Sequence, residues 1–406
     1  MDLVRNRTFL LLMLGEVIAG AGLWIFIIGN LQFMQHLVPS DTVKGLILMS
    51  GLFVGVLLSP KAGVIIDRSD KKKILFYSSV VRCFSPLLMI PAINMSSIWL
   101  MVLALIILQG SNAFYLPAVQ SSLPAIVGQS GLLRANSVYL NIVTLSRIGG
   151  TAVGGILVTT IQLNHMYLFT LATNVFLAVV MLWIHIPKDA ESKRRDNQEI
   201  RFTEIFALIK REPAIISGLL TTSIITVLLG GINLLILNFS EMQQSPELMG
   251  WIYTVEGSSI LIAGLISKRL IGNQNLITLT SILLFVFALS EFSMSFADNR
   301  WAVLIGFAIF GATVAFYFPS VNTIFQRRLP PETQGRFFAF KGMIERVIIQ
   351  LAVVFTGICL DLIGISLFML LVSIVTVSMG IFTLVYAKKH PVDVRQNQPE
   401  EQAASL

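Results

Sequence analysis

Charged residues are scarce in this sequence. Only 13% of its 406 residues are Asp, Glu, Lys or Arg, whereas an ordinary soluble domain contains about 25%. The hydrophobic fraction is 55% and the mean hydropathy is +0.80. These values exclude a soluble globular protein and predict a membrane protein. Because the apolar runs are about 20 residues long, they fit helices that cross a hydrocarbon core of about 30 Å, whereas a β-barrel would need short alternating segments.

Residues that hold metals or drive hydrolysis are also few. There are two cysteines and four histidines, and Cys83 and Cys359 each fall inside an apolar run, so neither a disulfide framework nor a metal-ligand spacing is present. The phosphate-binding pattern G-x-x-x-x-G-K-[ST] is missing, which disfavours an ATP-driven pump. We therefore expect no metal, no cofactor and no enzymatic activity.

Long polar stretches between the apolar runs are limited to one, at residues 187–212. The apolar runs predict twelve spans: 9–35, 42–66, 74–93, 97–118, 133–160, 165–186, 213–239, 247–267, 275–296, 301–326, 337–360 and 364–387. We expect an all-α membrane protein with two pseudo-symmetric six-helix bundles, at 1–186 and 213–390. Residues 187–212 would form a cytoplasmic linker and 391–406 a cytoplasmic tail.

Basic residues lie almost entirely on one side of this predicted topology. Of the 29 Lys and Arg residues, 23 fall on the side of the two termini, and only Lys44 and Arg300 flank the other side. The positive-inside rule therefore predicts that both termini are cytoplasmic. The net charge of +7 is explained by topology, so we expect anionic lipid headgroups as partners and no nucleic acid.

A proline-containing phrase occurs twice, as "FYLPAVQSS" from Phe114 and "FYFPSVNTI" from Phe316, 202 residues apart. Other matches at an offset of 201 or 202 join Arg134 to Arg336, and Gly63 with Arg68 to Gly264 with Arg269. This repeat supports two similar halves, a known plan for transporters that bind substrate between the halves. Pro117 and Pro319 would either bend their helices at a cytoplasmic gate or end them at the water boundary.

The loop "GVIIDRSDKKKIL", from Gly63, resembles the G-x-x-x-D-R-x-x-x-[RK]-[RK] signature of the major facilitator superfamily. Residues Gly63, Asp67, Arg68, Lys72 and Lys73 fit this pattern. The phrases "FYLPAVQSSLPAIV", "LLRANSV" and "HIPK" look like the macrolide-efflux and siderophore-exporter branch. The resemblance implies the major facilitator fold and a secondary active transporter in a bacterial plasma membrane. The residues assigned to gating are Gly63, Asp67, Arg68, Pro117, Pro319, Arg336, Glu345 and Arg346; Asp67 and its neighbours could instead anchor the loop to headgroups.

Small residues line one stretch of the fifth predicted span, "SRIGGTAVGG" from Ser146. Gly150, Gly154 and Gly155 allow close approach of a neighbouring helix. The stretch resembles the glycine motif of exporters, with Thr151 where that motif has proline. We expect these glycines to serve helix packing.

Ionisable residues inside the spans are rare, and each costs about 2.5 to 3.5 kcal/mol near mid-membrane unless it is paired or hydrated. Arg147 and Glu256 both fall near the middle of their spans. In the arrangement that the sequence resembles, their helices face one another, so they would form a state-dependent ion pair or line the substrate path separately. Glu16 would be a proton-carrying or substrate-binding carboxylate, or a structural hydrogen-bond partner. Glu291 is expected at the membrane interface.

Amide side chains are few in the spans that line the substrate path in the resembled family, and Gln109, Asn112 and Asn233 are candidate contacts. The span 97–118 lacks the arginine found there in many proton-coupled exporters. An apolar path favours a lipophilic or amphipathic substrate. The sequence thus predicts a monomeric exporter of drug-like small molecules by proton antiport. The alternatives are a dedicated exporter of a siderophore-like metabolite or lysolipid, and a non-transporting receptor or scaffold.

Overall fold

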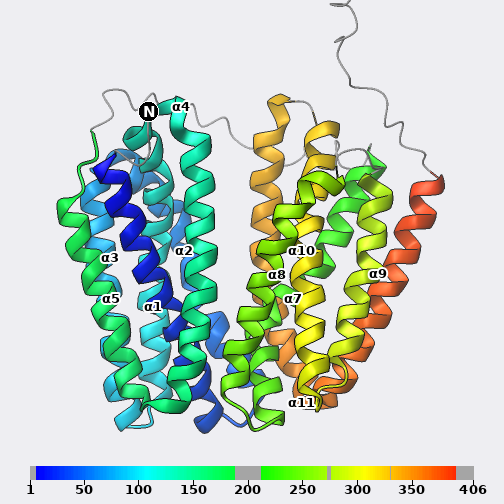
Figure 1. The fold of residues 1–406 in the computed structure, drawn as a ribbon, viewed down its shortest axis with the longest axis horizontal. Coiled ribbons are helices and arrows are strands. Elements are labelled where there is room, and N and C mark those ends of the chain that lie inside the picture. Colours follow the sequence, from blue (N-terminus) through cyan, green and yellow to red (C-terminus); the bar gives the residue numbers. More distant parts are fainter. Residues whose placement is uncertain (1–5, 188–211, 272–275, 330, 390–406) are drawn as a thin grey trace, which may run out of the picture. The chain divides into compact units, whose positions relative to one another are not determined.

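The computed structural model describes residues 6–187, 212–271, 276–329 and 331–389, and every regular element within these ranges is an α-helix (Figure 1). The helices are α1 (Arg7–Leu37), α2 (Asp41–Arg68), α3 (Lys71–Asn94), α4 (Ile98–Thr160), α5 (Leu163–Trp183), α7 (Pro213–Met242), α8 (Glu247–Ile271), α9 (Leu276–Met294), α10 (Arg300–Arg328) and α11 (Pro331–Lys389). Side chains cap several of them, since Asn6 accepts from the Phe9 N–H and Asn299 from those of Trp301 and Ala302. Such caps pair N–H groups that have no partner within the helix.

Two helices, α4 and α11, are much longer than a single span and are broken at a glycine. Gly128 in α4 and Gly364 in α11 both have a φ of +71°. This left-handed conformation is readily adopted by glycine and costly for residues with a Cβ atom. Each long helix therefore consists of two arms, before and after its glycine.

Eleven helical stretches within the described residues are long and apolar enough to cross a membrane. The spans predicted at 97–118 and 133–160 correspond to Ile98–Gly128 and Arg134–Thr160, the two arms of α4. Helix α4 does not end near Pro117, and α10 likewise continues past Pro319. The last stretch, Phe340–Tyr386, has 47 residues, includes Gly364 and overlaps both of the final predicted spans.

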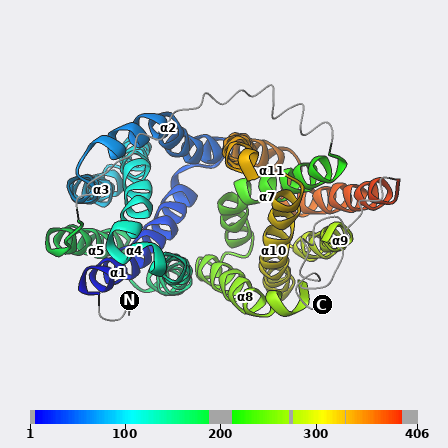
Figure 2. The same ribbon diagram turned by 90° about the horizontal axis from the view of Figure 1, so that it is seen from above.

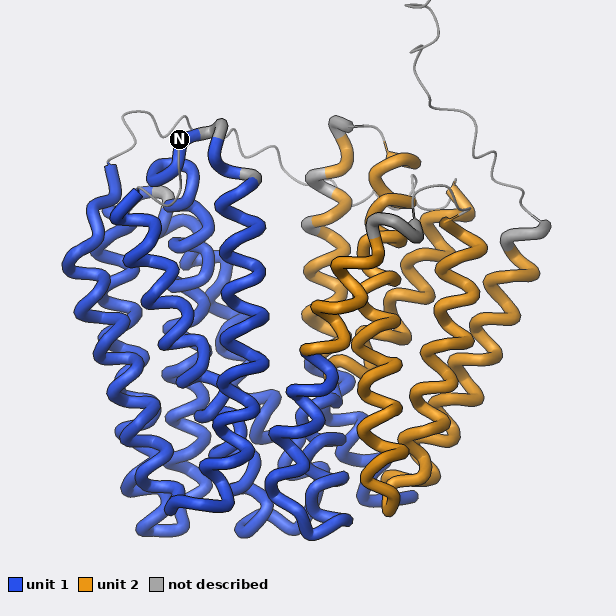
Figure 3. The backbone as a smooth tube through the Cα atoms, viewed as in Figure 1, with its two compact units in different colours: residues 1–196, 231–257, 350–364 blue, residues 197–230, 258–349, 365–406 orange. Residues whose placement is uncertain are grey.

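The chain forms two compact units (Figure 3). Unit 1 comprises residues 1–196, 231–257 and 350–364; unit 2 comprises 197–230, 258–349 and 365–406. Unit 1 therefore contains α1 to α5 together with the last part of α7, the first part of α8 and the last part of the first arm of α11. The predicted linker and tail lie almost wholly outside the described residues.

Helix α4 packs against α1, α2 and α3 in unit 1 (Figure 2). Helix α5 packs against α1 and α3. The shared core is apolar and includes Phe9, Leu12, Leu123 and Leu177. In unit 2, α10 packs against α9, with Phe287 and Phe310 in ring contact at 5.2 Å.

Candidate functional site

The predicted pair Arg147 and Glu256 lie in contact within unit 1. The Arg147 Nη1 atom, on the second arm of α4, is 3.2 Å from Oε1 and 3.0 Å from Oε2 of Glu256 on α8. Oε2 makes no hydrogen bond of good geometry within the described residues. The structure thus brings together two charges that belong to different halves of the sequence.

Aromatic and amide side chains surround this ion pair. The Arg147 guanidinium lies 5.8 Å from the ring centre of Trp24 on α1, close enough for a cation–π contact. The Trp24 ring is 5.5 Å from that of Tyr253 on α8, and the Tyr253 hydroxyl donates a hydrogen bond to the Asn233 Oδ1 atom on α7. We call Trp24, Arg147, Asn233, Tyr253 and Glu256 the Arg147 cluster. It joins α1 and α4 to α7 and α8 through polar contacts inside apolar helices.

Two members of the Arg147 cluster, Trp24 and Tyr253, were not among the predicted residues. Aromatic residues are common in membrane-spanning helices, so neither one is distinctive in the sequence. Tyr253 does precede Glu256 by three residues, a spacing that places both side chains on one face of a helix. That spacing is the signal by which Tyr253 could have been found.

The helices of this region approach closely at glycines. A Cβ atom added to Gly155 on α4 would lie 2.7 Å from the Gly250 Cα atom on α8, and one added to Gly150 would lie 2.6 Å from the Ala21 carbonyl oxygen on α1. At Gly154 the nearest atom would be Cδ1 of Ile28, at 2.8 Å. The three glycines expected to serve helix packing therefore lie at the contacts of α4 with α1 and α8.

Gly155→Val is expected to prevent the contact of α4 with α8, because the added side chain would meet backbone atoms that cannot move aside. Gly149→Val is the matched control, since a Cβ atom there has no atom within 4 Å. Disulfide cross-linking between cysteines introduced at Ala152 and Thr254, which line one small pocket between α4 and α8, should be fast in the Gly149→Val protein and slow in the Gly155→Val protein. Equal rates in the two proteins would show that the close approach is not needed.

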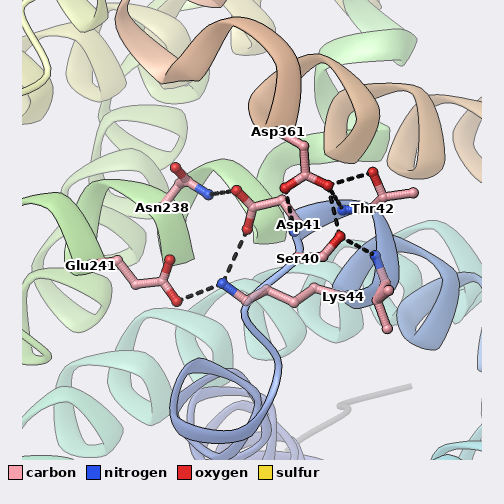
Figure 4. Close-up of polar contacts among 8 residues, drawn as sticks. Ser40, Asp41, Thr42, Lys44, Asn238, Glu241 and Asp361 are labelled. Atoms are coloured by element: carbon pink, nitrogen blue, oxygen red, sulfur yellow. Dashed lines mark hydrogen bonds and ion pairs between the residues drawn. The ribbon is translucent and has the colours of Figure 1, made fainter.

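A second polar network lies where α1 ends and α2 begins, which we call the α1/α2 end (Figure 4). Asp361, on the first arm of α11, accepts hydrogen bonds from the backbone N–H groups of Asp41 (2.8 Å) and Thr42 (2.9 Å). It also accepts from the hydroxyls of Ser40 (2.7 Å) and Thr42 (2.6 Å). Asp361 therefore caps α2 from another helix, where its negative charge also meets the positive end of the α2 dipole.

Lys44 links α2 to α7 in the same network. Its ammonium donates to Asp41 Oδ1 at 3.1 Å and to Glu241 Oε1 at 2.6 Å, and the whole residue is only 1% exposed. The Asn238 amide, also on α7, donates to Asp41 Oδ2 at 2.6 Å. We call Ser40, Asp41, Thr42, Lys44, Asn238, Glu241 and Asp361 the Asp361 network. Its members come from α1–α2, α7 and α11.

Close backbone contact accompanies the Asp361 network. A Cβ atom added to Gly357 on α11 would lie 2.4 Å from the Asp41 carbonyl oxygen, and one added to Gly45 would lie 2.9 Å from the Val353 carbonyl oxygen. Helices α2 and α11 thus touch along more than one turn. The sequence reasoning did not assign Asp361 or Glu241 to any site.

Glu16 points into unit 1, where the Tyr115 hydroxyl of α4 donates to its Oε1 atom at 2.5 Å. Arg82 of α3 is buried nearby and is within electrostatic range of Glu16, Tyr115 and Tyr139. The Arg82 Nε atom has no hydrogen-bond partner within the described residues. The first half therefore holds a buried carboxyl, a buried guanidinium and two tyrosines between α1, α3 and α4.

The tyrosine of the repeated phrase has a similar place in unit 2. Tyr317 of α10 is fully buried, and its hydroxyl forms hydrogen bonds with those of Thr221 and Thr222 on α7. Tyr115 joins α4 to α1, and Tyr317 joins α10 to α7. The prolines that follow at Pro117 and Pro319 are exposed inside continuous helices.

Glu291, which its position near the end of a predicted span placed at the membrane interface, is shielded by neighbouring helices in unit 2. It is fully buried on α9 in unit 2, faces Thr376 on the second arm of α11, and neither carboxyl oxygen makes a hydrogen bond of normal geometry within the described residues. The interfacial depth stays a prediction, and the structure adds that the packing of α9 against the second arm of α11 buries this side chain.

The other predicted site residues do not join these clusters. Asn112 donates to Gln109 at 3.2 Å on the same helix, and Glu345 accepts from Lys341 at 2.6 Å one turn earlier. Arg68 and Arg346 are exposed, and Gly63 faces open space. The side chains of Asp67 and Arg336 lie outside the described part of the structure.

Comparison with known proteins gives a family match over nearly the whole chain. The sequence model described as Major Facilitator Superfamily matches residues 12–349 and 237–406. The chain is 27% identical over 410 residues to the uncharacterized MFS-type transporter YfiS of Bacillus subtilis (strain 168), covering 95% of each protein. It is 23% identical over 348 residues to macrolide efflux protein A of Streptococcus pyogenes, covering 84% of this chain and 86% of that protein.

Solved transporter structures share the fold. The nucleoside transporter NupG superposes with a TM-score of 0.74 at 14% identity, covering 94% of this chain and 99% of NupG. A D-xylose-proton symporter superposes with a TM-score of 0.73 at 12% identity, covering 93% and 97%. At these identities the likeness concerns the fold, and it holds over almost the entire chain.

Proposed function

Because this chain belongs to the major facilitator superfamily, whose members are membrane transporters and not enzymes, we propose that it exports lipophilic or amphipathic small molecules by alternating access. The macrolide efflux relative and the apolar composition support this substrate class. The membrane is a bacterial plasma membrane with both termini in the cytoplasm, as the distribution of basic residues predicts. The α1/α2 end is then extracellular.

The proposed architecture has twelve spans in two six-helix halves, 1–186 and 213–390. The break at Gly364 supports a division of the stretch Phe340–Tyr386 into two spans. With 47 residues it is more than twice the length of about 20 that one crossing requires. The last arm then returns the chain to the cytoplasmic side.

The observation that carries the proposal is the Asp361 network. It ties α2 of the first half to α7 and α11 of the second half through ion pairs and hydrogen bonds. Such contacts can form and break as a unit, which is what a gate between two conformations requires. We assign the Asp361 network to an extracellular gate and the Arg147 cluster to a state-dependent contact deeper in the membrane. The cytoplasmic gating residues predicted from the sequence, including Asp67 and Pro117, would act in the opposite state.

Transport should be measured in inverted vesicles with a panel of macrolides and lipophilic cations, with and without an imposed proton gradient. We expect uptake into the vesicles that increases with the gradient. An uptake rate that is the same with and without the gradient would exclude proton antiport but would remain consistent with export. A lack of flux for the whole panel, together with robust flux of one siderophore-like metabolite or lysolipid, would overturn the drug-exporter assignment.

Glu16→Gln is expected to abolish the dependence of flux on the proton gradient, because a glutamine cannot carry the proton that we assign to the Glu16 carboxyl. Its hydrogen-bond partner Tyr115 can still donate to the amide oxygen, so the helix contact is retained. Glu291→Gln is the matched control: it makes the same change at another buried carboxyl, on α9. If the two proteins keep the same gradient dependence, Glu16 carries no transported proton.

A further inference from the structure

A groove with a volume of about 290 Å³ lies between α3 and α5 in unit 1. Ten side chains line it, and apart from the Cys83 thiol all belong to Phe, Leu, Val or Ala residues. One end of the groove is at Phe76 on α3 and Leu182 on α5, and the other is at Leu87 and Leu171. Several of these side chains, such as Phe84 and Val175, are also exposed on the outer surface. The groove is therefore apolar along its length and open to the membrane.

The length of the groove matches one leaflet of a bilayer. Phe76 and Leu87 are separated by 87 − 76 = 11 residues of continuous helix, which at about 1.5 Å per residue is about 16 Å. Half of a hydrocarbon core of about 30 Å is about 15 Å. A lipid leaflet whose headgroups lie at the start of α3 and the end of α5 would therefore cover the groove from one end to the other.

The shallow end of the groove carries positive charge. The Lys72 ammonium donates to the Leu182 carbonyl oxygen at 2.8 Å, which places it directly at the end of the groove. An ammonium group has three N–H donors, so this bond leaves others that can point to a headgroup. Lys73 is the next residue and is exposed. A basic pair therefore lies where the headgroup of a lipid seated in the groove would be.

We propose that this groove is a binding site for one acyl chain of an anionic phospholipid, whose phosphate is held by Lys72 and Lys73. The groove admits a flexible hydrocarbon chain but is too small for an α-helix of another protein, which is about 10 Å across. Because apolar packing alone does not distinguish a groove from bulk lipid, the two lysines supply the selectivity for a negative headgroup. In the orientation proposed above, the lipid belongs to the inner leaflet.

The proposal can be tested by native mass spectrometry of the full-length protein after reconstitution in vesicles of either phosphatidylglycerol or phosphatidylcholine. We expect wild-type protein to retain phosphatidylglycerol and not phosphatidylcholine. Val175→Trp, which fills the groove from an exposed position, should abolish this retention. Phe169→Trp is the matched control, because Phe169 is an exposed residue of α5 that does not line the groove.

The headgroup contact is tested by Lys72→Ala and Lys73→Ala, each of which should lower phosphatidylglycerol retention about fivefold. A phosphatidylglycerol with a photoactivatable acyl chain gives a second readout on the unaltered protein. Its adducts should map to peptides containing Phe76–Leu87 and Leu171–Leu182. Equal retention of the two lipids, unchanged retention in Val175→Trp, or adducts spread evenly over the outer helices would each overturn the proposal.

Discussion

Asp361→Ala is expected to open the α1/α2 end and to make residues beneath it reachable from outside the cell. The substitution removes the acceptor for two backbone N–H groups and two hydroxyls at the start of α2. A carboxylate that caps a helix N-terminus contributes about 1 to 2 kcal/mol, which corresponds to a shift of about 5- to 30-fold between closed and open states. Because Asp361 reaches α2 from α11, this energy acts on the contact between the two halves.

The reporter for this shift is a cysteine introduced at Val353 in a protein with Cys83→Ser and Cys359→Ser. Val353 is 1% exposed and contacts Gly45 of α2, so an impermeant maleimide added to intact cells should label it faster in Asp361→Ala. Asp361→Asn keeps one acceptor oxygen and should give an intermediate rate. Asp298→Ala, in the exposed turn between α9 and α10, is the control and should leave the rate unchanged. Identical labelling in all four proteins would show that Asp361 does not hold this end closed.

Single substitutions of the Arg147–Glu256 pair are expected to cause the largest loss of transport. Removing one partner of a buried ion pair leaves the other charge unpaired, which typically costs about 3 to 5 kcal/mol. Glu256 is 3% exposed but Arg147 is 21% exposed, so we expect a cost at or somewhat below the bottom of that range, about 2 to 3 kcal/mol, or a loss of about 30- to 160-fold. We expect this loss in Arg147→Glu and in Glu256→Arg, measured as initial export rate.

The double variant, Arg147→Glu with Glu256→Arg, should recover part of the lost export rate, because opposite charges again face each other. Arg134→Gln is the control, since Arg134 is an exposed residue at the start of the same arm of α4. If the double protein is as slow as the single ones while all of them reach the membrane, the two residues act separately, each through its own contact.

The Arg147–Glu256 contact was predictable because ionisable residues are rare inside apolar spans and both lie near the middle of one. The same rule did not extend to Asp361, which lies between two predicted spans, where charged residues are common. Its donors are two backbone N–H groups and two hydroxyls about 320 residues away along the chain, and no residue type indicates which distant backbone N–H groups a carboxylate accepts from. The Asp361 network could therefore not have been found from residue types alone.

Depth along a helix was a poor guide to burial. Glu291 was placed by its distance from the end of its span, yet neighbours on other helices bury it, as they bury Glu16. For Glu16 the partner is Tyr115, whose phrase was recognised as repeated but was interpreted through its proline. The offset of 202 residues identified the right segments. Their helix contacts, however, are made by the hydroxyl groups of Tyr115 and Tyr317 and not by the prolines.

The repeated tyrosine has a consequence for how the two halves came to differ. If both halves descend from one ancestral six-helix unit, Tyr115 and Tyr317 inherited the same position, but one now faces the carboxyl of Glu16 and the other faces two threonines. A threonine hydroxyl stays neutral at any physiological pH, so only the first of these positions can gain or lose a proton. If the tyrosine was retained in both halves while its partner changed, a structural hydrogen bond common to both halves would have become a proton-carrying site in the first half alone.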